Sequence, residues 1–240
     1  IKDFNYDHIP FQTVVMTSET KLSRIGIEVR GQRIAYLMGA GDEIPISLRQ
    51  IGFGVDEIKS DEISLERLIT YDALIVGVRA YNTDEQLKFK QRDIFEYVKQ
   101  GGNVIIQYNT ANGLITKELA PYPLTLSRNR VTVEEAEMRI LQPDHSVLNY
   151  PNKITSKDFE GWVQERGLYF PGEWDSKFTP IFSCNDPGEK PQDGSVLVAQ
   201  YGDGHYIYTG LSFFRQLPAG VSGAFRLFAN MISIGRNAQP

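Results

Sequence analysis

The 240-residue sequence lacks several features that would place it in a familiar class of proteins. Its single cysteine, Cys184, can form neither an intrachain disulfide bond nor a zinc site of several thiolates. No apolar run approaches the roughly 20 residues that span a bilayer, so we predict no membrane span. The net charge of -5 argues against nucleic-acid binding through a strongly basic surface. It is still compatible with a local basic site.

Sequence signatures of cofactor and metal sites are also missing. Gly39 and Gly41 follow an apolar run, as in a phosphate-binding turn, but Ile44 stands where the third glycine would be. The three histidines are far apart in the sequence and form no H-x-x-H pair. We therefore predict that this chain holds no nucleotide, no other cofactor and no metal.

Short apolar runs alternate with helical patterns in the first half of the chain. The runs span residues 33–38, 55–58, 72–78 and 103–108, and the helical patterns span residues 43–51, 64–70 and 84–100. Strands and helices that alternate with short connections are typical of a doubly wound parallel sheet. The sequence therefore predicts an α/β fold with three layers, of the flavodoxin-like type.

The second half of the chain has a different character. Residues 120–183 are rich in aromatic residues, prolines and short β-like runs, which predicts β-rich additions to the sheet. A hairpin is predicted over residues 195–209 and a closing helix over residues 220–234. We interpret residues 1–30 as an extended leader or linker and residues 31–236 as one domain. Because the chain begins at Ile1 without an initiator methionine, we also interpret it as a piece of a longer protein.

Polar side chains follow the predicted parallel strands. In open parallel sheets, ligands bind outside the carboxyl ends of the strands, where these residues would gather. We expect a neutral polar or anionic ligand, such as a sugar. The alternative is that the same side chains cap helices and satisfy turn backbone. The candidate ligand-binding residues are Asp42, Arg79, Tyr81, Asn82, Gln107, Asn109, Thr110 and Arg215.

Residues 162–174 form a dense aromatic and charged segment. Trp162, Tyr169 and Trp174 are interleaved with polar residues, a pattern that can stack on sugar rings. The alternative, which we favour from the sequence, is a β-layer that packs on the sheet, with Glu165 and Arg166 paired.

The order of these segments resembles a known superfamily. The strings Tyr71–Val76, Gly101–Thr110 and Tyr206–Phe213 resemble the class I glutamine amidotransferase-like superfamily. Other strings are similar to the C-terminal domain of PIG-L (LmbE-like) deacetylases of Bacteroidetes, and the likeness covers about residues 30–236. These strings are Gly39–Asp42, Gly77–Thr83, Gln107–Thr110, Trp162–Phe170 and Leu217–Val221.

The resemblance implies that the chain is not a working amidotransferase. Active members carry a cysteine nucleophile in the turn after the strand equivalent to residues 103–108, where this chain has Asn109. Their later His-Pro-Glu run, which supplies the base and its orienting carboxylate, is replaced by residues Ser212 to Arg215. The A-H-P-D-D and H-x-x-H runs of the zinc deacetylase are absent as well. They would lie in another part of the parent protein.

We therefore expect a catalytically inactive accessory domain of a PIG-L-type N-acetyl-sugar deacetylase. It would bind carbohydrate or dock against the hydrolase domain of the same polypeptide. The resemblance further implies a periplasmic or cell-surface location. Two alternatives remain open: an unusual hydrolase with Cys184 or Thr110 as its nucleophile, and a purely structural domain that contacts other subunits.

Overall fold

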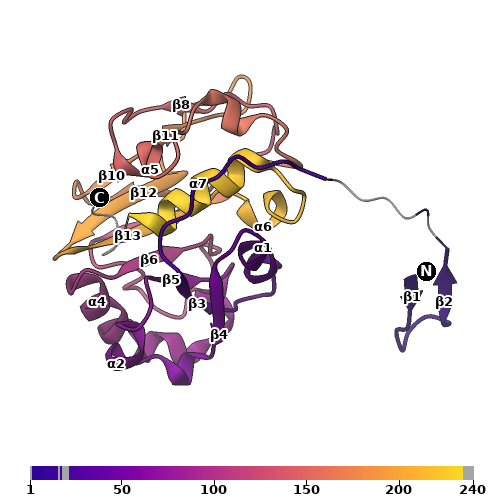
Figure 1. Ribbon diagram of the computed structural model, residues 1–240, viewed down its shortest axis with the longest axis horizontal. Helices are drawn as coiled ribbons and strands as arrows, with labels where there is room; N and C mark the ends of the chain where they lie inside the picture. The colour runs from indigo at the N-terminus through magenta and orange to yellow at the C-terminus, as the bar shows by residue number, and fades with distance from the viewer. Residues whose placement is uncertain (1, 16, 18–21, 235–240) are drawn as a thin grey trace.

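The computed structural model describes residues 2–15, 17 and 22–234. Its centre is a seven-stranded sheet with the order β10-β12-β13-β6-β5-β3-β4 (Figure 1). Five neighbouring strands are parallel: β13 (Gly204–Thr209), β6 (Asn103–Ile106), β5 (Ala73–Val76), β3 (Arg33–Leu37) and β4 (Gly54–Ile58). The antiparallel strands β12 (Val196–Tyr201) and β10 (Phe178–Pro180) extend one edge. The predicted mostly parallel α/β fold is confirmed.

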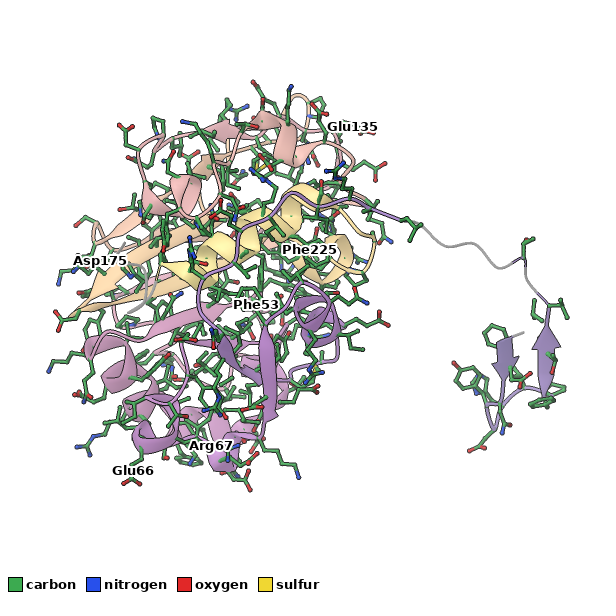
Figure 2. The ribbon with its side chains drawn as sticks, in the orientation of Figure 1. Phe53, Glu66, Arg67, Glu135, Asp175 and Phe225 are labelled. Carbon is green, nitrogen blue, oxygen red and sulfur yellow. The ribbon has the colours of Figure 1, made fainter. Side chains whose placement is uncertain are left out.

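Helices cover both faces of the sheet and give the three layers. Helices α1 (Ile44–Gln50) and α7 (Ser222–Ser233) pack on one face, and α2 (Leu65–Leu68) and α4 (Gln91–Lys99) pack on the other. Alternate residues of β3 supply both cores, since Tyr36 packs with α1 and α7 while Leu37 packs with α2 and α4. Phe53 and Phe225, labelled in Figure 2, belong to the core on the α1 and α7 face.

The remaining helical segments are short. They are η1 (Ser60–Glu62), α3 (Ala80–Thr83), η2 (Glu85–Phe89), α5 (Ser146–Asn149), η3 (Ser156–Phe159) and α6 (Phe213–Gln216). No helix in the described part of the chain is long and apolar enough to cross a membrane.

The single helix predicted over residues 84–100 is broken in the structure. The Asp84 side chain accepts a hydrogen bond from the Gln86 backbone and opens η2, whose i→i+3 bonds end at Lys90. Helix α4 then begins at Gln91 and ends before Gly101, whose φ of 95° lies in the left-handed region that favours glycine. The tighter 3-10 turns replace the first third of the predicted helix.

The predicted β-rich additions include a separate ribbon of β7 (Leu124–Val131) and β9 (Gly167–Trp174). Its register shifts between Leu126 and Val131, so both strands are bulged. The Ser127 hydroxyl bridges the bulge, because it donates to the Phe170 carbonyl at 2.6 Å and accepts from the Asn129 amide at 2.9 Å. A second short pair joins β8 (Arg139–Ile140) to β11 (Phe182–Ser183).

Residues 22–30 run alongside α7 toward the sheet (Figure 1), with Ile25, Ile27 and Val29 against the core. Two buried asparagines fasten this segment. Asn152 exchanges hydrogen bonds with both backbone groups of Glu28, and Asn230 of α7 in turn holds Asn152. Before this segment, β1 (Lys2–Phe4) and β2 (Gln12–Val14) form a hairpin that lies apart from the sheet in Figure 1.

Asn230→Ala should destabilise the fold by about 3 kcal/mol, because it leaves the carbonyls of Val147 and Asn152 and the Asn152 amide unpaired in the interior. Urea unfolding measures this loss. The exposed substitution Lys157→Ala is the control and should change stability by less than about 0.5 kcal/mol. An equally small effect of Asn230→Ala would contradict the assigned role.

Stability should fall as the pH drops below about 6.5, the ordinary pKa of histidine. Burial lowers the pKa of His145, and the charge of His205 lowers it further, while burial also lowers the pKa of His205. The unfolded chain therefore takes up protons first, so this stability is present above about pH 6.5 and is lost in acid. His145→Asn keeps a side chain that can cap α5 and should flatten the profile measured by thermal unfolding. His8→Asn, at an exposed position, is the control.

Candidate ligand-binding site

A cavity of about 620 Å³ lies where the carboxyl ends of β6 and β13 meet the β7–β9 ribbon. Two of the sequence-predicted residues, Thr110 and Arg215, contribute to its wall. The others come from the ribbon and from the segments beside it. The full lining is Thr110, Asn112, Arg128, Arg130, Glu165, Leu168, Tyr169 and Arg215.

Asn109 lies inside the protein and does not reach this cavity. Its side chain is fully buried, accepts a hydrogen bond from the Tyr81 amide at 2.9 Å and donates one to the Gln107 carbonyl at 2.9 Å. Its own backbone amide donates to the Tyr208 hydroxyl at 3.2 Å. The residue nearest the position of an amidotransferase nucleophile thus ties together the ends of β5, β6 and β13.

Three further candidates lie beneath the strand ends, two of them buried and the third, Asp42, half-buried. Tyr81 is fully buried and donates from its hydroxyl to Gln91, and burial raises its pKa. Gln107 is 1% exposed and donates to the Tyr36 hydroxyl, which in turn donates to Asp42 at 2.7 Å. Burial raises the pKa of Asp42. Tyr81 and Gln107 thus hold neighbouring groups inside the protein, and Asp42, which is half-buried, does not line the cavity.

Asn82 and Arg79 belong to the turn after β5. Asn82 accepts a hydrogen bond from the Thr110 amide at 2.9 Å and donates to the Thr110 carbonyl at 3.1 Å, so it fixes the loop that bears Thr110. Arg79 is exposed, and its φ of 57° is unusual for a residue with a side chain. It does not line the cavity. Burial raises the pKa of Tyr108, and the charge of Arg79 offsets part of that rise.

Glu165 pairs with Arg215, and this corrects the expected pairing with Arg166. The Arg215 Nε lies 2.7 Å from the Glu165 carboxylate. Arg166 is buried and donates instead to the carbonyls of Ala136 and Phe159, with its guanidinium 5.7 Å from the centre of the Trp162 ring. The aromatic segment is therefore divided: Trp162 packs in the core while Glu165 and Tyr169 face the cavity.

An aromatic wall borders the cavity. Tyr169 stacks on Tyr108 with ring centres 6.1 Å apart and an angle of 9° between the planes, and Tyr108 also contacts Phe214. The φ of Tyr169 is 50°, in the left-handed region, at the irregular part of the β7–β9 ribbon. Strained backbone of this kind concentrates at ligand sites, because the surrounding structure must hold it in place.

Arg128 and Arg130 are site residues that the sequence analysis missed. Both lie on β7 and are exposed, and no carboxylate of the described residues lies within 4.0 Å of either guanidinium. In the segment Ser127–Arg130, polar residues do not alternate with apolar ones, so the sequence does not predict a strand there. A signal that could have found them is the i, i+2 spacing of two arginines, which places both on one side of a regular strand.

Neither suggested nucleophile is arranged for catalysis. Cys184 is fully buried in the core on the α1 and α7 face, and burial raises its pKa to about 12. The Thr110 hydroxyl donates to the Asn112 carbonyl at 2.8 Å. Among the described residues with side chains, positive φ occurs at Arg79, Gln164 and Tyr169, and not in the turn after β6, where a strained nucleophile elbow would stand. No group of three His, Cys, Asp or Glu in the described residues could hold a metal ion.

Comparison with known proteins gives the fold. No family model matches the sequence, and no curated protein matches it. A cytoplasmic protein of Salmonella typhimurium LT2 superposes with a TM-score of 0.56 at 13% identity, covering 85% of this chain and 100% of that one. The chain has a glutamine amidotransferase-like fold.

Two other solved structures agree with this assignment. A GMP synthase-type protein of Thermoplasma acidophilum gives a TM-score of 0.53 at 11% identity, over 86% of this chain and 96% of that one. A ThuA-like protein of Bacteroides uniformis gives 0.52 at 12% identity, over 90% and 95%. Identities this low show a common fold alone.

The Cys184 thiol should react with Ellman's reagent only when the protein unfolds. With a pKa of about 12, about one thiol in ten thousand is ionised at pH 8, and burial denies the reagent access. The absorbance of released thionitrobenzoate in native buffer and in urea measures this difference. Rapid labelling of the native protein would contradict this expectation and support Cys184 as a nucleophile. Cys184→Ser gives the background of the assay.

Proposed function

We propose that this chain is a catalytically silent binding domain that takes carbohydrate into the cavity at the strand ends. The observation that carries the proposal is a cavity of about 620 Å³ with an aromatic wall and polar lining. In the turn beside this cavity, the side chain of Asn109 makes its hydrogen bonds inside the protein. Sugar sites commonly combine an aromatic face, on which the apolar side of the ring stacks, with side chains that hydrogen-bond the hydroxyls.

The groups around the cavity suit this ligand class. Tyr169 offers a ring that is half-buried and stacked from behind by Tyr108, so it is held rigid. Thr110, Asn112 and Glu165 offer hydroxyl, amide and carboxylate groups. A ring stacked on Tyr169 would find these hydrogen-bonding groups in the same cavity.

We further propose that the domain serves a PIG-L-type N-acetyl-sugar deacetylase in the same polypeptide, at the periplasm or cell surface. The support is the resemblance of the strings around residues 39–42, 77–83, 107–110 and 162–170. In this arrangement the hydrolase domain would supply the zinc chemistry and this chain would retain the substrate. Docking against the hydrolase domain is the second role that the same attachment allows.

Tyr169→Asn should weaken sugar binding about tenfold, because the stacking contact contributes roughly 1 to 1.5 kcal/mol. Asparagine tolerates positive φ better than most residues, so the variant removes the ring and keeps the backbone. Calorimetry with chitooligosaccharides and other neutral glycans measures the affinity, and Phe89→Asn, an exposed aromatic away from the cavity, is the control.

The absence of sugar binding in a broad glycan screen would defeat the carbohydrate proposal. Loss of deacetylase activity in the full-length protein on changing Arg79 to Ala, without any sugar binding by the domain, would instead support docking. Sequencing the rest of the polypeptide for an A-H-P-D-D run tests the proposed attachment separately.

A further inference from the structure

We infer that the ligand of this cavity is an acidic sugar, whose carboxylate, sulfate or phosphate group is bound by Arg128 and Arg130. The inference rests on the proposed carbohydrate function and names the chemical class of its ligand. It is carried by the charge of the cavity wall, by the availability of its guanidinium groups and by the way in which the ribbon places them.

The cavity is positively charged on a negatively charged protein. Arg128, Arg130 and Arg215 line it together with a single carboxylate, that of Glu165, which leaves two net positive charges. The whole chain carries a net charge of -5, so this concentration of cations departs from the average surface. A concave site lined by one sign of charge attracts ligands of the opposite sign.

Arg128 and Arg130 are not engaged in ion pairs. No carboxylate of the described residues lies within 4.0 Å of them. Hydrogen bonds from Thr132 and Val133 outweigh the burial of Asp186 and lower its pKa, and the charge of Arg130 adds a smaller contribution. The N–H groups of the Arg130 guanidinium are therefore available to another acceptor.

Arg215 is only partly used by its partner. Its hydrogen bond to Glu165 comes from Nε, and 34% of the side chain is exposed. The pair fixes the direction of the side chain beside Tyr169 and Phe214. Guanidinium groups present planar forks that match the two oxygens of a carboxylate, sulfate or phosphate, which neutral sugar hydroxyls do not require.

The ribbon explains why these cations stand beside the aromatic wall. The register shift lies between Leu126 and Val131 on β7, opposite the part of β9 that carries Tyr169. Bulges redirect side chains and are frequent next to functional sites. The irregular part of the ribbon thus carries a ring and two guanidinium groups that line one cavity, as an acidic sugar needs.

Calorimetry on the chain tests the inference with four probes: N-acetylglucosamine, its 6-phosphate, its 6-sulfate and glucuronic acid. The wild type should bind the acidic sugars about tenfold or more tightly than the neutral one at about 20 mM sodium chloride, where screening is weak. The preference should shrink at about 300 mM salt. The three acidic probes separate phosphate, sulfate and carboxylate.

Arg128→Gln with Arg130→Gln should abolish the preference for acidic sugars, because it removes both guanidinium groups from the cavity wall. The fold should be retained, since both side chains are exposed. Arg92→Gln, an exposed arginine on α4 outside the cavity, is the matched control. Circular dichroism verifies that each variant is folded.

Two results would overturn the inference: equal binding of acidic and neutral sugars, or an acidic preference that survives in the double variant. If Tyr169→Asn still weakens the binding of the acidic and neutral sugars, the carbohydrate site stands and only its acidic specificity fails. If inorganic sulfate binds through the two arginines while none of the sugars binds, the anion site stands and the carbohydrate function fails, so the acidic-sugar inference falls with it.

Discussion

The buried side chain of Asn109 is the constraint on which the site depends. A primary amide has both donors and an acceptor, so one group can satisfy the Tyr81 amide and the Gln107 carbonyl at once. The backbone amide of Asn109 also donates to the Tyr208 hydroxyl, so this residue joins three parallel strands at their carboxyl ends. A thiol could not make these bonds, and an unpaired amide in the interior is costly. The same hydrogen bonds hold the strand ends beneath the cavity and keep the Asn109 side chain inside the protein.

The parallel sheet was predictable because its strands are continuous apolar runs. Residues 73–76 and 103–106 are buried on both faces, so each run could be recognised without knowledge of its neighbours. The closing helix was predictable for a similar reason, since Phe225 and Phe228 recur at helical spacing. The break at residues 85–90 was not predicted, because 3-10 and α-helical turns share nearly the same apolar spacing over so short a segment.

The site was only partly predictable. Thr110 and Arg215 follow parallel strands, and the rule for open sheets places them at one edge. The same rule does not distinguish side chains that point inward, so Tyr81, Gln107 and Asn109 were grouped with them although they are buried. Arg128 and Arg130 come from a ribbon whose bulges destroy the alternation on which strand recognition depends. Their position follows from tertiary pairing with residues about 40 positions away.

The β7–β9 ribbon is a sheet of its own, not hydrogen-bonded as a strand to the seven-stranded sheet. Residues of the ribbon that line the cavity can therefore change without altering the strand pairing of the seven-stranded sheet. Substitutions at exposed positions such as Arg128 and Arg130 carry little risk to folding, whereas those at the strand ends beneath them carry much more. This separation gives the scaffold a high capacity to evolve: relatives with the same sheet could acquire unrelated preferences by remodelling two bulged strands.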